Sequence, residues 1–486
     1  MYLGIDIGTS ELKALLLDEC GEIVGTAHAE LTVQRPHPQQ AEQNPLDWWQ
    51  ACGRVVSELR HQYPQQWAAI RAIGLSGQMH GAVLLDNEGN VLRPCILWND
   101  TRSAAECEWL RVHHPEMMTI SGNMIMPGFT APKLVWLARH EPEIFRRVAK
   151  VLLPKDYLRW RMTGEFVSDP SDSSGTLWLD VAKRDWSDQL LAMTDLRRDQ
   201  MPDLVEGSEV SGMLRASLTT EWGLSPSVIV AGGGGDNAAS AVGVGAVMPG
   251  DAFISLGTSG VIFVVNDVLQ ADPASGVHAF CHALPGRWHQ MSVMLSAAAC
   301  LRWVCSLLSV TESQLMTEIA QLEDSDLCRA PLFLPYLSGE RSPHNDPQAS
   351  GCFFNLRHET NRALLGYAVI EGVAFGLADG LRVLSSARIN QCSLTGGGAR
   401  SPVWAQLIAD VLAIPVVTHP ASSSGALGAA RLAWLADGGT EAAVCLKPPV
   451  SAQYTPQPER HIWLSQRLEL FRLLYQQQQM ARKLLP

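Results

Sequence analysis

The sequence predicts an α/β protein made of two related halves. Its 486 residues are enough for two or three domains, and 47% of them are hydrophobic, which allows a large core. The tripeptide Gly-Thr-Ser occurs at 8–10 and again at 257–259, about half the chain apart, each time between two apolar runs. Apolar runs at 227–231 and 392–394 lead through glycines into helical patterns. These strand-to-helix units and the repeated Gly-Thr-Ser tripeptide indicate a duplicated α/β domain.

The first residues predict a β-hairpin followed by a third strand. The apolar runs Tyr2–Ile7 and Ala14–Leu17 flank the turn at Gly8–Ser10, and residues 18–22 form the next turn. Because apolar residues then recur with helical spacing, we expect helices further along the first half. These helices are predicted at 48–60 and 104–112.

The second half opens with a similar hairpin, predicted from apolar residues at 253–254 and 261–265. The glycine-rich stretch 243–250 precedes it and contains a proline, so it marks a boundary between the domains. The longest apolar stretch, Met291–Leu301, is too short to cross a bilayer and predicts a buried helix. The predicted domains are residues 1–245 and 246–486.

Composition and charge limit the binding partners that we expect and the cell compartment in which the protein works. The chain has 37 Lys+Arg against 49 Asp+Glu and a net charge of −12, with no basic block, which argues against nucleic acid and against a membrane surface. Eleven cysteines without a C-x-x-C pair argue against disulfides and zinc and indicate a reducing compartment. Because Asp6 and Glu11 interrupt the first residues, no signal peptide is expected. We therefore expect a cytoplasmic protein that binds small molecules.

The two Gly-Thr-Ser turns are candidate phosphate sites. Such a turn offers unpaired backbone N–H groups and two hydroxyls at one point, although a single copy is also typical of a plain hairpin. Two copies that face each other across a cleft grip a polyphosphate from both sides. Lys13 lies within side-chain reach of the first turn, and Asp6 precedes it, where a carboxylate can hold hydrated Mg²⁺.

The segment from Gly232 to Asp236 is a candidate catalytic site. Four glycines follow a predicted strand and let the backbone turn sharply, and Asp236 then begins a helix of small residues. An aspartate there can accept a proton from a hydroxyl that attacks a phosphoryl group. The alternative interpretation is an N-cap. A dinucleotide fingerprint over 233–238 is disfavoured, because the second strand ending in an acid is missing.

Two further glycine turns are candidate binding sites. Gly396–Gly398 allows a nucleotide base or ribose to lie on bare backbone, or serves close packing, and the chain has no Walker A motif. Met79 and His80 lie between Gly77 and Gly81 after another predicted strand. The aromatic, amide and carboxylate groups of Trp98-Asn99-Asp100 downstream favour a polyol pocket, whereas a lone histidine is commonly structural.

Taken together, these motifs resemble the FGGY carbohydrate kinases over nearly the whole chain. In order, the matching segments read GIDIGTS, GQMHG, LWND, GFTAPKLVWLARH, LLPKDY, GGGGDN, SLGTSG, FLPYLSGERSPHNDP and TGGGAR. The family's second signature, near 351–371, departs at Asn355 and Leu364. The resemblance implies two RNase H-like domains of the actin/Hsp70 type with a catalytic cleft between them. It also implies that the first domain binds sugar and carries the base, and that the second binds the nucleotide.

The resemblance assigns roles to the candidates. It implies Asp236 as catalytic base and Asp6 as support for Mg²⁺-nucleotide chemistry. The implied sugar site comprises Met79, His80, Trp98, Asn99 and Asp236, and the implied ATP site comprises Gly8, Thr9, Ser10, Lys13, Gly257, Thr258, Ser259, Gly397 and Gly398. The implied reaction is phosphorylation of D-xylulose by ATP with Mg²⁺, in xylose catabolism. Apart from the resemblance, a homodimer is one candidate assembly. A kinase for another ketose or polyol and a non-kinase actin/Hsp70-type ATPase remain alternatives.

Overall fold

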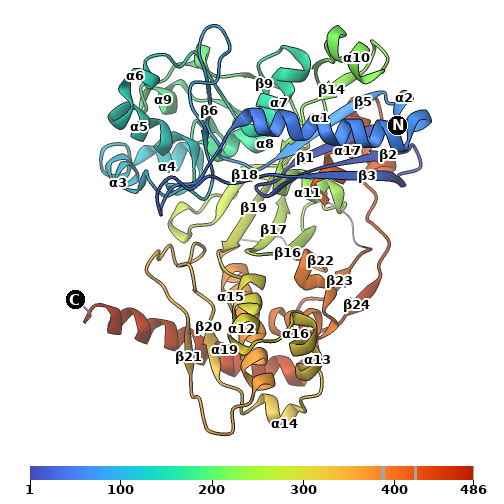
Figure 1. Cartoon of the computed structure of the whole chain (residues 1–486). Coiled ribbons are helices and arrows are strands. Elements are labelled where there is room, and N and C mark those ends of the chain that lie inside the picture. The colour runs from blue at the N-terminus through green and yellow to red at the C-terminus, as the bar shows by residue number, and fades with distance from the viewer. Residues whose placement is uncertain (385–388, 421–423, 485–486) are drawn as a thin grey trace.

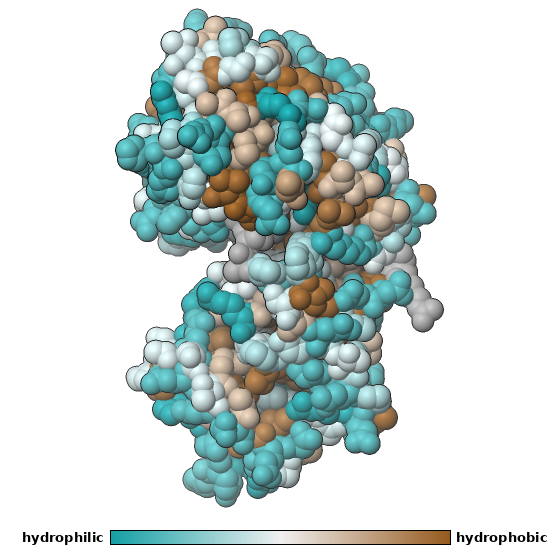
Figure 2. Space-filling view, turned by 90° about the vertical axis from the view of Figure 1, so that its right-hand side faces the viewer, coloured by the Kyte–Doolittle hydropathy of each residue, from teal (hydrophilic) through white to brown (hydrophobic). Residues whose placement is uncertain are grey.

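The computed structural model describes residues 1–384, 389–420 and 424–484. Figure 1 shows the first half of the chain, blue to green, above the second half, yellow to red, and each half is built around its own sheet. The space-filling view in Figure 2 shows the same two lobes with a narrow waist between them.

The first sheet begins with the predicted hairpin and third strand. Its antiparallel part is β1 (Tyr2–Ile7), β2 (Glu11–Leu17) and β3 (Ile23–Glu30). Strand β5 (Ala72–Gly77) then pairs parallel with β1, and β14 (Ile229–Ala231) pairs parallel with β5. The sheet is completed by β13 (Val210–Met213) at the edge and β15 (Gly234–Gly235) beside β5.

The second sheet repeats this order. Strands β16 (Ala252–Leu256), β17 (Gly260–Asn266) and β19 (Trp288–Met294) are antiparallel neighbours. Strand β22 (Cys392–Thr395) pairs parallel with β16, and β23 (Val416–Thr418) pairs parallel with β22. The edge strands are β18 (His278–Cys281) and β24 (Ala452–Tyr454). The repeated order confirms the prediction of two duplicated α/β domains of the actin type.

One predicted element was wrong. The apolar stretch Met291–Leu301 was expected to be a single buried helix, but it divides into the end of β19 and the start of α12 (Ala298–Leu308). Both parts are largely buried, so apolar residues follow one another without a regular spacing. Hydrophobic periodicity therefore does not distinguish a strand from a helix here. The chain changes direction at Ala297, where the backbone leaves the helical region.

Helices cover both sheets and join the lobes. Asn44 caps α1 (Pro45–Gln62) by accepting a hydrogen bond from the backbone of Leu46. Helix α15 (Arg362–Arg382) is long and apolar enough to span a membrane, but it is buried in the core of the second lobe. The other long helices are α3 (Ala104–His113), α5 (Thr130–His140), α7 (Pro154–Thr163), α11 (Asp236–Gly243), α13 (Glu312–Ile319), α16 (Pro402–Leu412), α17 (Ser424–Ala436) and α19 (Pro458–Arg482).

Helix α17 comes late in the chain but packs against the first sheet, on β1, β2 and β5, and beside α11. Glycines permit this close approach. A Cβ on Gly4 would lie 2.0 Å from the carbonyl oxygen of Ala426, and one on Gly74 would lie 1.8 Å from that of Ala429. Gly4 and Gly74 are cross-strand neighbours, so together they form a flat strip on which the helix lies. The first lobe is therefore completed by a segment of the second half.

Candidate active site

A small cavity lies between the two halves of the chain. Its volume is about 120 Å³, the space of roughly four water molecules at about 30 Å³ each, which suits a single small sugar or polyol. It brings together four of the residues predicted to bind sugar. The lining consists of Met79, His80, Trp98, Asp236 and Asn237 from the first half and Ser259, Val261, His278, Met291, Val293 and Arg341 from the second.

Asp236 is the first residue of α11, and the cap position is Gly235. The N-cap interpretation of Asp236 therefore does not describe the structure. Its Oδ1 atom accepts hydrogen bonds from the backbone N–H of Asn237 at 2.7 Å and from its side-chain amide at 3.0 Å. Burial raises the pKa of Asp236 to about 7, and the charge of Asp6 contributes. A carboxylate with such a pKa can take up a proton near neutral pH.

Asp6 is the charged residue that acts on the pKa of Asp236. Its Oδ1 atom accepts a hydrogen bond of 2.8 Å from the hydroxyl of Ser76, and burial raises its pKa. Its Oδ2 atom faces the first turn of α17 at Gly425, where a Cβ would lie only 2.7 Å away. The space beside this carboxylate therefore depends on a glycine.

These two carboxylates fit a magnesium ion bound through a nucleotide. Among the residues that the structure describes, no group of three or more His, Cys, Asp or Glu side chains could hold a metal. Magnesium in phosphoryl-transfer sites keeps several waters and needs only one or two protein carboxylates together with phosphate oxygens. Asp6 and Asp236 are carboxylates of the kind that such a site needs.

His80 lies in the left-handed region, with φ of 69°, directly after β5. Its Nδ1 atom is 2.7 Å from the carbonyl oxygen of Gly175. Because a carbonyl only accepts, Nδ1 carries the proton and donates, and Nε2 is left as an acceptor. Burial lowers the pKa of His80 to about 3, so the ring is neutral. The fixed tautomer suits a hydroxyl donor, such as one on a sugar.

Trp98 connects the cavity to the first Gly-Thr-Ser turn. Its indole N–H donates to the Thr9 hydroxyl at 3.0 Å, and that hydroxyl donates to Gln78 at 3.0 Å. Gly8 N–H donates to the carbonyl of Glu11 at 2.9 Å and closes the turn. Within the described parts of the chain, the backbone N–H groups of Thr9 and Ser10 have no acceptor.

The second Gly-Thr-Ser turn is held in a similar way. Gly257 N–H donates to the carbonyl of Ser259 at 3.0 Å. The N–H groups of Ala298, which begins α12, and of Ala297 before it donate to the carbonyls of Gly257 and Thr258 at 2.9 Å each. Arg302 donates to the Thr258 hydroxyl at 2.8 Å. The N–H of Thr258 has no acceptor in the described ranges. An anion at this turn would meet a free N–H and the guanidinium of Arg302.

A larger cavity of about 1030 Å³ begins on the other side of this turn. Gly257 and Thr258 line the large cavity, whereas Ser259 lines the small one, so the turn separates the two. Gly396 has φ of 87°, which lets the chain fold back after β22 and expose the next glycines. The rest of the lining is mixed polar and apolar, including Gly397, Gly398, Arg400, Leu301, Arg302, Met316, Val403 and Trp404.

Some sequence-predicted residues lie outside both cavity linings. Ser10 is exposed, and Lys13 pairs with Glu11 at 2.9 Å. Asn99 follows Trp98 but does not line the small cavity, and its side-chain oxygen is enclosed without a hydrogen-bond partner among the described residues. The structure thus gathers Met79, His80, Trp98 and Asp236 at one cavity and Gly257, Thr258, Gly397 and Gly398 at the other.

Sequence reasoning did not single out several lining residues. Asn237 and Arg341 lie inside segments that matched a family motif, GGGGDN and FLPYLSGERSPHNDP, so a signal for them existed. Arg302 follows directly after the apolar run 291–301, and no motif marked it. No local signal marked His278, which reaches the cavity only because β18 forms the edge of the second sheet beside β19.

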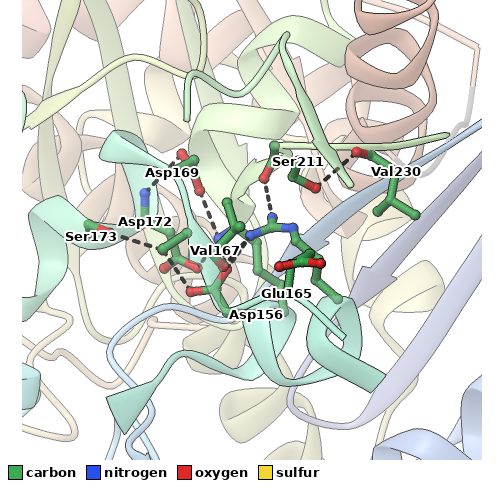
Figure 3. A network of polar contacts seen from close by, with 12 residues as sticks. Asp156, Glu165, Val167, Asp169, Asp172, Ser173, Ser211 and Val230 are labelled. Carbon is green, nitrogen blue, oxygen red and sulfur yellow. Dashed lines mark hydrogen bonds and ion pairs between the residues drawn. The ribbon is translucent and has the colours of Figure 1, made fainter. Parts of the chain in front are cut away.

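Behind the glycine loop lies a fully buried ionic cluster, part of which Figure 3 shows from close by. The ammonium of Lys155 is 2.6 Å from Asp156, 2.7 Å from Asp169 and 3.1 Å from Asp172. Although burial alone would lower it, these carboxylates raise the pKa of Lys155. Burial raises the pKa of Asp172 well above its usual range, while Lys155 acts in the opposite direction. Arg159 is bonded to Asp156 at 2.9 Å and adds a second cation to the three carboxylates of the cluster.

The cluster is bonded to the loop that carries Asp236. Arg159 donates to the carbonyl of Gly232 and, at 2.6 Å, to that of Val167. The Ser171 hydroxyl donates to Asp169 and accepts a hydrogen bond of 3.2 Å from the N–H of Gly235. Both ends of the four-glycine loop are therefore fixed from one side, which positions the first turn of α11.

Comparison with known proteins identifies similar chains. The FGGY family of carbohydrate kinases matches with its N-terminal domain over residues 1–243 and with its C-terminal domain over residues 252–436. A xylulose kinase from Escherichia coli is 52% identical over 98% of this chain and 99% of its own length, and one from Klebsiella pneumoniae is 48% identical over 98% of each. The solved structure of a "xyloylose kinase" from Brucella ovis superimposes with a TM-score of 0.95 at 49% identity, covering 99% of both chains.

Proposed function

The chain belongs to the FGGY family of carbohydrate kinases, and on this premise we propose that it phosphorylates D-xylulose with ATP to give D-xylulose 5-phosphate. The observation that carries the proposal is the small cavity, where Asp236, His80 and Met79 meet Ser259 of the second half. Full-length similarity to the two xylulose kinases supports D-xylulose as the sugar. The nucleotide site is the larger cavity on the other side of the turn.

In this proposal, the C5 hydroxyl of the sugar points at Asp236. The hydroxyl oxygen forms a bond to the γ-phosphorus while the bond from that phosphorus to the β–γ bridging oxygen breaks, and ADP leaves. Asp236 takes the hydroxyl proton. The free N–H groups of the two Gly-Thr-Ser turns stabilise charge on the transferring group, and the Nε2 atom of His80 accepts from another sugar hydroxyl. Magnesium held beside Asp6 supplies further charge neutralisation when it is bound.

The division of labour between the halves is part of the same proposal. Residues 1–245 supply the base and most of the sugar contacts, and residues 246–486 supply the nucleotide site. Asp6 is the residue that holds magnesium, while Gly8–Ser10 and Lys13 contact the phosphates of the bound nucleotide. We further propose a cytoplasmic enzyme, for which a homodimer is the expected assembly.

A coupled assay for ADP with a panel of pentuloses, hexuloses and polyols tests the substrate. D-xylulose should give the highest kcat/KM, and a higher value with glycerol or L-ribulose would contradict the assignment. Asp236→Ala should lower turnover about 10²- to 10⁴-fold while sugar binding remains measurable. ATP hydrolysis that does not respond to any sugar would instead favour the actin/Hsp70-type ATPase.

A further inference from the structure

The wall that the second half contributes to the small cavity carries two polar side chains, Arg341 and His278. In the described ranges, the Arg341 guanidinium makes no hydrogen bond or ion pair. The neighbouring Glu340 does not neutralise it by contact, because its Oε1 atom accepts from the backbone N–H groups of Leu295 at 2.9 Å and of Arg341 itself at 2.7 Å. A partly buried cation is thus left without a hydrogen-bonded partner of opposite charge among the described residues.

His278 is nearly enclosed, with 2% of its surface exposed. Its ring packs against those of Phe129 and Phe280, at centroid distances of 5.4 and 5.3 Å. Its Nε2 atom has no hydrogen-bond partner among the described residues. Burial, and then the charge of Arg341, holds the pKa of His278 well below its usual range, so the imidazole is neutral and has one donor and one acceptor.

Arg341 reaches the small cavity beside Gly128 of the first lobe. A Cβ on Gly128 would lie 3.3 Å from its Nη2 atom and 2.7 Å from the carbonyl oxygen of Trp98, so the guanidinium crosses from the second lobe to a glycine of the first. The positive charge of Arg341 acts on the pKa of His80 and of His278. The charge that acts on Asp236 is that of Asp6.

The chemistry of a 2-ketopentose gives the part of the cavity beside Arg341 a specific ligand. Ring closure joins the C5 oxygen to C2, so a sugar whose C5 hydroxyl is free to react has a free C2 carbonyl as well. With C5 at Asp236, that carbonyl lies toward the opposite end. A carbonyl oxygen only accepts and a guanidinium only donates, so the two groups are complementary. A partly buried cation without a partner is unfavourable, and an acceptor on the ligand relieves that cost.

We propose that Arg341 donates to the C2 carbonyl oxygen of the bound sugar and that His278 binds the adjacent hydroxyl, so that the second lobe selects open-chain 2-ketoses over the corresponding pentitols. This inference rests on the proposed function. In this inference, the first lobe binds the end of the sugar that reacts, and the second lobe binds the end with the ketone carbonyl.

The test compares D-xylulose with D-arabitol, which differs in having a hydroxyl in place of the C2 carbonyl. Calorimetric titration without ATP gives the Kd of each ligand, and the coupled assay gives kcat/KM for D-xylulose. Arg341→Met keeps the apolar stem of the side chain and removes the donors, Arg341→Lys keeps the charge, and His278→Phe keeps the ring packing but loses both nitrogens. Arg287→Met, which removes a second-lobe arginine paired with Glu441, is the matched control.

Arg341→Met should weaken D-xylulose binding roughly 10- to 100-fold and D-arabitol binding less than threefold, so that discrimination is lost. Arg341→Lys should retain part of the discrimination between D-xylulose and D-arabitol. His278→Phe should lower this discrimination roughly 3- to 10-fold, and Arg287→Met should leave it unchanged. An equal loss for both ligands, or no loss, would overturn the proposal even if the wild-type enzyme phosphorylates D-xylulose. If the wild-type enzyme does not, the proposed function fails, and this inference fails with it.

Discussion

The Ser171 hydroxyl accepts a hydrogen bond of 3.2 Å from the backbone N–H of Gly235. Gly235 precedes Asp236 and caps α11, so this one bond joins the buried ionic cluster to the residue proposed as base. A structural role and a catalytic role can be distinguished here because the cluster also contains serines that do not contact the glycine loop.

Ser171→Ala should lower kcat on the order of 10-fold, because Asp236 is no longer held in one position. The Kd for D-xylulose should change less than threefold. Ser173→Ala is the control, since the Ser173 hydroxyl bonds to that of Ser168 at 3.0 Å within the same cluster but does not contact the loop. If both variants lose kcat and stability in parallel, Ser171 serves only the stability of the lobe.

The pH dependence of kcat/KM should report Asp236. Because burial raises its pKa to about 7, the fraction in the ionised form that can accept a proton increases as the pH rises through 7. We expect an acid limb with an apparent pKa near 7 in the free enzyme, measured between pH 5 and 8.5. Activity that is flat down to pH 5 would contradict a base with this environment.

Asp236→Asn should stabilise the ligand-free protein at alkaline pH. The folded-state pKa is raised above the unfolded value near 4, so the native state binds the proton more tightly, and the contribution of Asp236 to stability falls as the pH rises from about 4 to 7. An asparagine does not ionise and avoids this loss. The melting temperature of the variant relative to wild type, measured in EDTA, should therefore increase between pH 5 and pH 8. A pH-independent difference would be inconsistent with the raised pKa.

His80→Asn should act on sugar affinity. Asparagine tolerates the left-handed backbone found at this position, and its amide can still donate to Gly175, but it lacks an acceptor at the place of Nε2. We expect the KM for D-xylulose to rise roughly 10-fold, with no change in ADP formation without sugar. An unchanged KM together with a lower melting temperature would mean that His80 is structural.

Adjacent residues of the second turn should affect different substrates. Thr258 lines the large cavity and Ser259 the small one. Thr258→Val should raise the KM for ATP roughly 10-fold and leave that for D-xylulose within twofold, because it removes a hydroxyl bonded to Arg302. Ser259→Ala should show the reverse. Equal effects of both variants on both substrates would indicate a single shared site.

Local patterns predicted the parts of the fold that depend on local chemistry. Both Gly-Thr-Ser hairpins are confirmed because alternating runs and turn residues specify them within about ten residues of chain. The run 291–301 was assigned wrongly because a strand and a helix buried on all sides have the same apolar composition. Hydrophobic periodicity alone does not distinguish such a strand from such a helix.

The site was predictable to a similar extent. Asp236 and His80 follow strand ends next to glycines, and such ends are recognisable from sequence. Arg341 and His278 reach the cavity from a loop and an edge strand whose positions depend on the packing of two lobes. Asn99 is a residue for which proximity in sequence misled, because Trp98 next to it lines the cavity and Asn99 does not.

The docking of α17 on the first sheet also bears on how the chain folds as it is synthesised. The segment 1–245 emerges first, but the strip formed by Gly4 and Gly74 has no cover until residues 424–436 have been made. Until then, the amino-terminal lobe exposes an apolar sheet face whose partner helix does not yet exist. Domains that fold one after another during synthesis avoid such a delay. Here the first lobe to appear is completed among the last, and a fragment cut near residue 245 would lack the helix that covers it.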